Sequence, residues 1–488
     1  MPTREITVAT LWQFASQCVM AVLSILTVKF VAVGLSRDLV GAYNSAYGYL
    51  QLFGILADFG LYAVAVREMS RAEKAGRVFR TFFHIRLITT FFALGGAILL
   101  AWTLPQWRAT PLSLGITFAA LVPFFTLLAG VCRAVFQVQY RMHLVFVAEV
   151  GQRLITAFLL GMLLLRGVRE SADVTHFHFF ILFGGVGALF LFLFSLIRSW
   201  KILPSRHGGA LPMGPFFRAA LPYGIAYVCI ALYRQFDVTL IALLRPDFQL
   251  QNAHYGFALR LAEMAYLVPT FLLNAALPRL RGGAADRQLL SRLFFSLLMF
   301  GTTVALIAGL WATPIMRLLT SEAYLSTGTA AGADSALMLL ALPMFLNSLI
   351  LFCFYVLLSS NTWRPLLSIL SLGALLSLTA NLLLIPQYGF MGAGIASIGT
   401  HTVLCALLLP CVRRRVGSLP WTLLLRWIMF AILLALSLIL MRPFLVTPFH
   451  SIMGALLCGV VVVVLLEVLG IRKTLLGNCA KGVGAVQW

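Results

Sequence analysis

The stretch HFHFFILFGGVGALFLFLFSLIR, residues 176–198, decides the class of this protein. It carries no acidic side chain, and its only basic residue apart from histidine is Arg198 at its end. About 20 apolar residues in a helix cross the hydrocarbon core of a bilayer. The stretch therefore predicts a membrane-spanning helix.

The composition shows that this stretch is typical of the whole chain. Of the 488 residues, 61% are hydrophobic and 10% are charged, whereas soluble domains are about 25% charged. So few charges cannot cover the surface of a soluble protein of this length. The composition excludes a soluble enzyme, a disordered chain and a disulfide scaffold, and it leaves a polytopic membrane protein.

Hydropathy divides the chain into many similar segments joined by short loops. We predict an all-α protein with about fourteen transmembrane helices. The predicted spans are residues 8–34, 40–66, 81–104, 112–136, 144–166, 176–198, 219–243, 252–277, 293–317, 335–360, 365–386, 390–411, 421–441 and 450–470. No loop between them is long enough for an extramembrane domain.

The net charge of +21 is distributed unevenly over the loops. Most of the 36 Lys and Arg residues fall on loops that lie on the same side as the N-terminus, such as Arg67–Arg80 and Arg413–Arg415. Cytoplasmic loops carry such an excess. We expect both termini to be cytoplasmic, and the basic character then requires no nucleic-acid partner.

A weak internal repeat predicts two halves. Tyr43, Phe59 and Arg67 match Tyr255, Phe271 and Arg279 at one offset, which equals six spans. Parallel repeats of six helices suit alternating access, in which one half rocks against the other. The predicted organisation is an N-lobe (1–198), a cytoplasmic linker (199–215), a C-lobe (216–415), and two further spans with a cytoplasmic tail (416–488).

Charged residues inside spans are costly and usually face a cavity or a partner. Three acid–base sets have the spacing of neighbours on one helix face, i,i+3 or i,i+4. The pairs are Glu149/Arg153, Arg234/Asp237 and Arg260/Glu263, and the remaining charges are Lys29, Asp58 and Arg86.

Two interpretations of these charges stay open. Each pair neutralises itself, or the bases line a polar cavity and bind an anionic substrate, for which the planar guanidinium of arginine is suited. The acids would then hold the bases when the site is empty, or bind a coupling H⁺ or Na⁺. Prolines inside spans, at Pro123, Pro222, Pro269 and Pro343, are expected to interrupt their helices.

Signatures of enzymes are missing from the sequence. It holds no Asp-X-Asp, no nucleophile elbow, no HExxH and no P-loop. The eight cysteines form no CxxC pair, and we expect neither a metal site nor a resident cofactor.

The sequence resembles the Wzx-type polysaccharide flippases of the superfamily that also contains the MATE exporters. YNSAYGYLQLFGILADFGLYAVAVREMSR, residues 43–71, is similar to the second-span region of that family, with Asp58, Gly60, Arg67 and Glu68 at its motif positions. LPYGIAYVCIALYRQFDVTLIALL from Leu221 and YGFALRLAEMAYLVP from Tyr255 resemble the seventh and eighth spans. LLLIPQYGFMGAGIAS, residues 382–397, resembles the family's turn, where Pro386 is expected to end a helix.

The resemblance implies a two-lobed, MATE-like transporter with a central cationic cavity in the bacterial inner membrane. Its implied substrate is a polyprenyl-diphosphate-linked oligosaccharide for surface polysaccharide, such as O-antigen. The implied substrate contacts are Arg234 and Arg260, with a looser match for Lys29, Arg86 and Arg153. The residues that we predict for coupling or counter-charge are Asp58, Glu149, Asp237 and Glu263. Only Asp58 matches a motif position of the family, and that position is equally open to a structural link with the inner loop.

Two other transporters remain alternatives, a MATE-type cation-coupled exporter of small molecules and a flippase for a peptidoglycan lipid precursor. Apart from the substrate and the lipid bilayer, a polysaccharide polymerase and other assembly proteins are the partners that the resemblance suggests. The sequence does not identify the glycan or the coupling ion.

Overall fold

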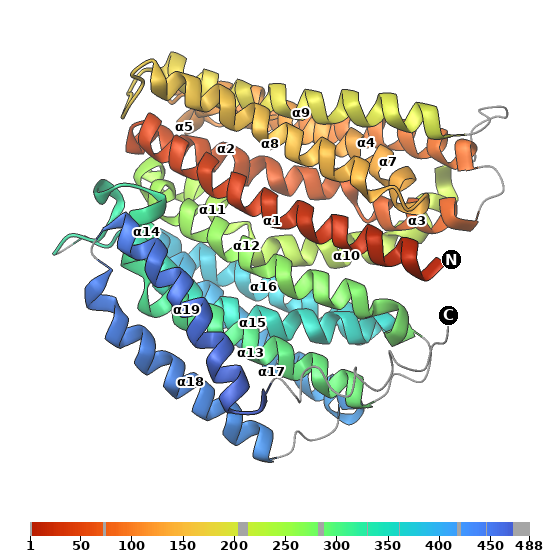
Figure 1. Cartoon of the computed structure of the whole chain (residues 1–488). Coiled ribbons are helices and arrows are strands. Elements are labelled where there is room, and N and C mark those ends of the chain that lie inside the picture. The colour runs from red at the N-terminus through yellow and green to blue at the C-terminus, as the bar shows by residue number, and fades with distance from the viewer. Residues whose placement is uncertain are drawn as a thin grey trace. The chain divides into compact units, whose positions relative to one another are not determined.

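The computed structural model describes residues 2–71, 75–203, 213–281, 287–328, 330–360, 362–416, 421–445 and 447–471. Residues 204–212 of the predicted linker and 472–488 of the predicted tail lie outside these ranges, as do the side chains of residues 275 and 279 in the internal repeat. Within the described ranges the regular structure is helical, as Figure 1 shows. The prediction of an all-α protein is confirmed.

The chain divides into two compact units, residues 1–256 and 257–488. The predicted lobes at 1–198 and 216–415 stay a prediction. The helices of unit 1 are α1 (Pro2–Gly34), α2 (Arg37–Asp58), α3 (Leu61–Arg71), α4 (Ala75–Thr103), α5 (Pro105–Arg108), α6 (Leu112–Ala119), α7 (Leu121–Val138), α8 (Met142–Leu165), α9 (Val174–Ile202), α10 (Met213–Arg234), α11 (Asp237–Leu244) and the start of α12 (Phe248–Arg281).

Unit 2 contains the rest of α12 and seven further α-helices among its described residues. They are α13 (Arg287–Leu310), α14 (Ala312–Leu319), α15 (Ala333–Ser359), α16 (Trp363–Tyr388), α17 (Phe390–Val416), α18 (Trp421–Met441) and α19 (Pro448–Val468). Two short 3₁₀ turns lie at Glu322–Tyr324 and Arg442–Phe444.

The lengths of these helices agree with the predicted spans. Among the described residues, thirteen helical segments are long and apolar enough to cross a membrane, and Val19–Gly34 of α1 forms a shorter apolar helix. The protein is therefore a multi-pass membrane protein, and its described residues form thirteen of the about fourteen predicted spans, with a shorter apolar helix in place of the first. The ends of α18 coincide with the prediction at 421–441.

Several spans are broken where the hydropathy pattern is continuous. Between α2 and α3, Phe59 and Gly60 both have positive φ, 38° and 72°. α10 ends at Arg234 and α11 begins at Asp237. The prediction that prolines interrupt the helices is wrong for Pro222 and Pro343, which lie inside α10 and α15.

Pro269 likewise lies within α12. Neighbouring helices and local adjustments accommodate the backbone groups that a proline frees in a membrane helix. Pro386 also stays inside α16, and the chain reverses only at Gly389, which has a φ of 57°. A backbone with positive φ is what glycine adopts without strain, so Gly389 and not Pro386 ends that helix.

Unit 1 is organised around α7. Residues of α3, α4 and α7, together with Phe216 and Ala220 of α10, form one buried apolar cluster. α4 and α9 both pack against α7. Two of these helices, α4 and α7, also carry Arg86 and Arg133, which form ion pairs with residues of other helices.

Unit 2 has α15 at its centre and α18 and α19 at its edge. In their most apolar windows, 72% of the α15 residues are buried, against 17% for α18 and for α19. The indole nitrogens of Trp311 and Trp427 donate to the carbonyl of Leu438 (2.9 Å) and the hydroxyl of Thr302 (2.8 Å). These bonds attach α18 to α13 and α14, and most of the last two spans faces outward.

Candidate functional site

The first cluster of charged residues joins α4 to the break between α2 and α3. Nη2 of Arg86 forms an ion pair with Oδ1 of Asp58, and Nη1 donates to the carbonyl of Ala57 at 3.2 Å. The guanidinium also lies 5.3 Å from the centroid of the Phe82 ring. The Arg86 side chain is 2% exposed and that of Asp58 is 27% exposed. Arg86 therefore neutralises both a carboxylate and the negative end of the α2 dipole.

The break itself packs against α10. A Cβ on Gly60 would meet Tyr223 and the backbone of Ala220 and Gly224, and a Cβ on Gly224 would meet the ring of Phe59. The two glycines therefore allow the broken span and α10 to approach closely. Phe59 adopts positive φ in the same place, which is uncommon for a residue with a side chain.

A second polar cluster joins α3, α7 and α8. Nη1 of Arg133 lies 2.9 Å from Oε1 of Glu149. The hydroxyl of Tyr62 donates to Oε1 of Gln137 at 2.6 Å. The structure thus gives Glu149 a partner on the preceding helix, Arg133, which is not among the predicted site residues.

The third cluster surrounds Asp237. We expected Arg234 and Asp237 to share one helix face, and the structure corrects this, because the helix is broken between them. Asp237 stands in the first turn of α11, where a carboxylate stabilises the helix. It is 1% exposed, and the hydroxyl of Tyr255 donates to its Oδ2 at 2.7 Å. The break thus places a buried acid at a helix start and within reach of Tyr255.

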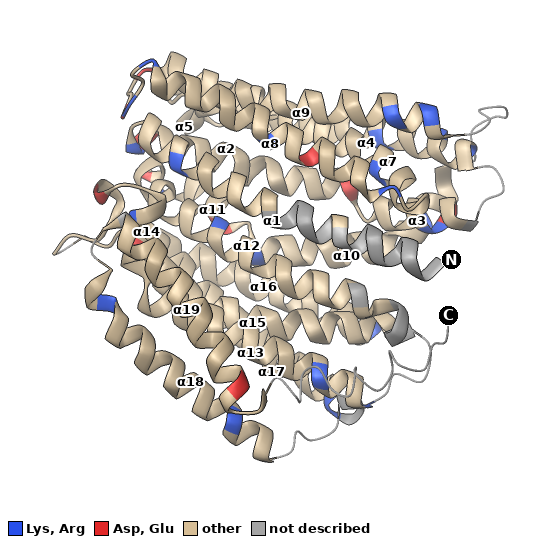
Figure 2. Ribbon diagram, in the orientation of Figure 1, with Lys and Arg blue, Asp and Glu red and all other residues tan. Residues whose placement is uncertain are grey.

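The remaining predicted residues lie on unbroken helices. Lys29 is on α1, Arg153 is on α8, and both are half-buried. Arg260 and Glu263 lie on α12 in unit 2, where the predicted i,i+3 spacing on one helix is present. In Figure 2 the blue and red bands of charged residues are sparse along the helices of unit 1.

Close backbone packing marks a fourth polar cluster, which joins α2 to α11 and the start of α12. Nδ2 of Asn44 donates to the carbonyl of Asn252 (3.0 Å), and Nδ2 of Asn252 donates to Ser45 (2.8 Å) and to the carbonyl of Val238 (2.9 Å). A Cβ on Gly41 would collide with the carbonyl of Gln249. Both amides are buried, so α2 and α12 are held together by hydrogen bonds shielded from water.

Equal depth in the membrane is the signal from which the partners of the charged residues could have been predicted. Asp58 and Arg86 lie at similar distances along the chain from residue 73, and Arg133 and Glu149 lie at similar distances from residue 140. Antiparallel neighbours joined by a short loop place such residues at one level of the membrane. Tyr255, Asn44 and Asn252 are polar residues within spans, but they carry no charge and were therefore not singled out as partners.

A family model described as "Polysaccharide biosynthesis protein" matches residues 6–281. A comparison with curated proteins finds no match. The sequence resemblance to polysaccharide transporters is confirmed by the family model.

Solved structures of the same fold match this chain over 83% to 95% of its length. The lipid II flippase MurJ in an inward closed conformation matches with a TM-score of 0.66 and 12% identity, over 95% of this chain and 98% of that one. An inward-facing MATE family multidrug transporter of the MOP superfamily matches with a TM-score of 0.62 and 11% identity, over 83% and 98%. A MOP superfamily transporter from Pyrococcus furiosus, described by the reverse polarity of its binding pocket, matches with 0.58 and 13%, over 86% and 97%. At these identities the likeness shows the fold.

Proposed function

We propose, from the premise that the chain belongs to the polysaccharide biosynthesis protein family, that it is a flippase for a lipid-linked oligosaccharide. Its substrate is a polyprenyl-diphosphate-linked oligosaccharide, which it moves from the cytoplasmic to the outer leaflet of a bacterial inner membrane. The family and the fold are those of transporters, not of enzymes.

The observation that carries this proposal is the excess of basic over acidic residues within the spans. Five predicted bases stand against four predicted acids, and three of those acids contact groups on other helices, Arg86, Arg133 and Tyr255. Such spans suit an anionic diphosphate better than a cationic drug. Guanidinium groups bind phosphate oxygens in bidentate fashion.

We assign the contacts with the anionic head group to Arg234, Arg260, Lys29 and Arg153, each at some stage of its passage. Arg86 is buried and bound to Asp58 in this conformation. Its contribution to substrate binding therefore requires release from that carboxylate. The lipid tail stays in the bilayer during transport.

Alternating access fits the fold and the polar contacts of unit 1. The hydrogen bonds of Asn44 and Asn252 and the packing at Gly60 connect early helices to α10, α11 and α12. A rocking motion that separated these helices would expose the buried amides to water. The cycle is driven by a substrate gradient or an ion gradient, with Asp58, Glu149, Asp237 and Glu263 as the candidate carboxylates for H⁺ or Na⁺.

A transport assay with the purified protein tests the proposal. Proteoliposomes containing the protein and a polyprenyl-diphosphate-linked oligosaccharide are treated with a membrane-impermeant glycosidase, which digests only glycan on the outer face. Loss of a charge-assisted hydrogen bond costs about 1.5–3 kcal/mol. Arg234→Ala and Arg260→Ala should therefore slow translocation by roughly tenfold or more.

Arg169→Ala is the matched control, since it removes an exposed arginine from a loop. It should translocate like the wild-type protein. Full activity of both Arg234→Ala and Arg260→Ala would overturn the assignment of these residues. A polymerase or another assembly protein is not required for this assay, so a defect would lie in the flippase itself.

The same proteoliposomes separate the proposal from the MATE-type alternative. A cation-coupled exporter would carry a small organic cation along an imposed ion gradient and leave the lipid-linked glycan in its leaflet. A peptidoglycan-precursor flippase would prefer the lipid-linked precursor of the cell wall. Direct competition between the two lipid-linked substrates would show which one is preferred.

A further inference from the structure

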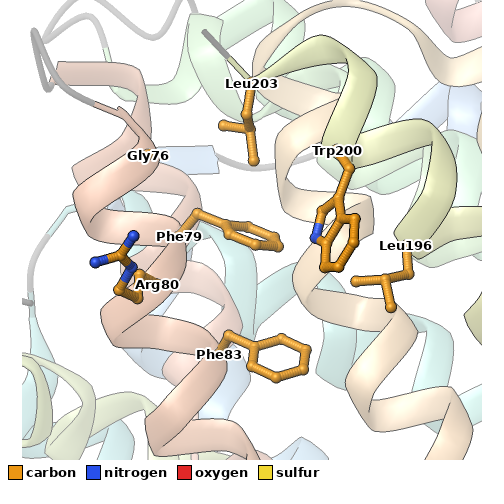
Figure 3. A pocket seen from close by; sticks show the side chains of 7 residues that line it. All are labelled: Gly76, Phe79, Arg80, Phe83, Leu196, Trp200 and Leu203. Carbon is orange, nitrogen blue, oxygen red and sulfur yellow. The ribbon is translucent and has the colours of Figure 1, made fainter. Parts of the chain in front are cut away.

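A small cavity in unit 1 is lined by residues that belong to none of the four polar clusters described above. It has a volume of about 210 Å³ and is lined by Gly76, Phe79, Arg80 and Phe83 of α4 and by Leu196, Trp200 and Leu203 at the end of α9. α4 and α9 both pack against α7. Figure 3 shows the rings of Phe79 and Phe83 facing Trp200 and Leu196 across the hollow. We call this hollow the α4–α9 pocket.

The lining of the pocket suits hydrocarbon. It is mainly aromatic and aliphatic, and its volume is below the range of about 300–1,000 Å³ that is usual for small-molecule sites. Exposed apolar residues continue from Trp200 along α9 at helical spacing, through Ile197 and Leu193. A segment of an acyl chain can therefore enter the pocket while the rest of the chain follows this outward-facing stripe.

Basic residues lie on the same turns of α4 and α9 as the pocket, and one of them, Arg80, lines it. Arg77 and Arg80 lie on the first turns of α4, and Arg198 and Lys201 lie on the last turns of α9. Neither helix carries an acidic residue between its ends. In Figure 3 the guanidinium of Arg80 points away from the aromatic rings, so its charge lies beside the apolar hollow.

The position along the span agrees with a membrane interface. The loop charges predict that the start of α4 and the end of α9 lie at the cytoplasmic side. Trp200 is 52% exposed, and tryptophan is enriched at the level of the lipid head groups. Basic pockets between membrane helices on the cytoplasmic side attract anionic lipid head groups.

We propose that the α4–α9 pocket binds one anionic phospholipid of the cytoplasmic leaflet. An acyl chain fills the space between Phe79, Phe83 and Leu196, and the phosphate lies at the rim among the bases of α4 and α9. This is a lipid site separate from the residues assigned to the transported substrate.

Native mass spectrometry of the purified protein tests the site. The probes are phosphatidylglycerol, which is anionic, and phosphatidylcholine of the same chains, which is zwitterionic. Each base near an anionic lipid surface contributes about 1 kcal/mol, which is roughly fivefold in binding. The double variant Arg80→Gln/Lys201→Gln should therefore bind phosphatidylglycerol about 25-fold more weakly, with phosphatidylcholine binding little changed.

Three further variants control for the overall charge and for the filling of the pocket. Arg364→Gln removes an exposed base from the start of α16 in unit 2 and should leave lipid binding unchanged. Leu196→Phe fills the pocket and should weaken both lipids, while thermal unfolding reports whether it is folded. Phe83→Leu serves in its place if Leu196→Phe is not folded, since removal of the ring should weaken both lipids.

Equal binding of the two lipids by the wild-type protein would overturn the proposal. The proposal would also be overturned if Arg364→Gln weakened phosphatidylglycerol binding as much as Arg80→Gln/Lys201→Gln does. The loss would then reflect the total charge of the protein and not the bases near the pocket. Binding of glycerol phosphate alone with the affinity of the whole lipid would show that no acyl chain is involved.

Discussion

Arg86 holds the end of α2 by two groups at once, the carboxylate of Asp58 and the adjacent carbonyl of Ala57. The chain then passes through two residues of positive φ before α3 begins. An ion pair at this position does more than balance charge. It also joins α4 to the point at which the span of α2 and α3 is broken.

Removing Asp58 should therefore be more damaging than removing Arg86. Asp58→Ala leaves a guanidinium buried at 2% exposure without its carboxylate, and breaking a buried pair costs about 3–5 kcal/mol. Arg86→Met leaves a carboxylate that is 27% exposed and reaches water, so the loss should be smaller. Thermal unfolding in detergent measures the stability of both variants. The double variant Asp58→Ala/Arg86→Met should lose less stability than the two single variants together.

Glu322→Ala is the control for this pair of variants. Glu322 is 72% exposed in its ion pair with Arg317, and exposed pairs contribute about 0–1 kcal/mol. Similar unfolding temperatures for Asp58→Ala and Glu322→Ala would contradict a structural role. Asp58→Asn that unfolds like the wild-type protein yet fails in transport would favour the coupling role.

A side chain at Gly41 should destabilise the protein, whereas a side chain at Gly54 should be tolerated. A Cβ on Gly41 meets the backbone carbonyl of Gln249, whereas a Cβ on Gly54 of the same helix meets nothing within 4 Å. Gly41→Ala should destabilise the protein by about 1–3 kcal/mol through overpacking. Gly54→Ala should be neutral or stabilise by up to about 1 kcal/mol, since alanine favours helix. Equal unfolding temperatures for the two variants would contradict the close approach of α2 and α12.

The sequence predicted the number and placement of the spans because each must present a long apolar surface to lipid. α18 begins and ends where the hydropathy does. The breaks were missed because they depend on backbone conformation. Nothing in an apolar pattern indicates that Phe59 adopts a φ of 38° or that its ring lies against Gly224.

The charged residues of the candidate site could be predicted from the sequence, but the residues that they contact could not. Asp58, Glu149 and Asp237 stand out as acids inside spans, but each has a partner on another helix, at Arg86, Arg133 and Tyr255. Helical spacing within one span could not show this. Only the reversal of the chain at short loops sets which residues of different spans lie at equal depth.

Tyr255→Phe should test the burial of Asp237 with a change of one oxygen atom. The hydroxyl donates to the carboxylate at 2.7 Å. Its removal leaves a buried acceptor with one hydrogen bond fewer, at a cost of about 1–3 kcal/mol. The unfolding temperature of Tyr255→Phe should therefore be lower than that of the wild-type protein. Tyr388→Phe, at an exposed position, should leave the unfolding temperature unchanged. A wild-type unfolding temperature for Tyr255→Phe would contradict the importance of this bond.

The loop between α11 and α12 gives a prediction that depends on pH. Nε of Arg245 donates to Oδ1 of Asp247 at 2.7 Å, and Nε2 of Gln251 donates to Oδ2 at 2.8 Å. The hydrogen bonds from Arg245 and then Gln251 lower the pKa of Asp247 below its ordinary value of 3.8.

A lowered pKa means that the ionised form is favoured by folding. The stabilisation is therefore complete above pH about 5 and disappears as the pH falls through the pKa of the folded protein. Since the pair is partly exposed, it should contribute only a few tenths of a kcal/mol. Asp247→Asn should unfold at a slightly lower temperature than the wild-type protein at pH about 7, and the difference should vanish in strong acid or high salt. A difference that grew on acidification would contradict the ion pair.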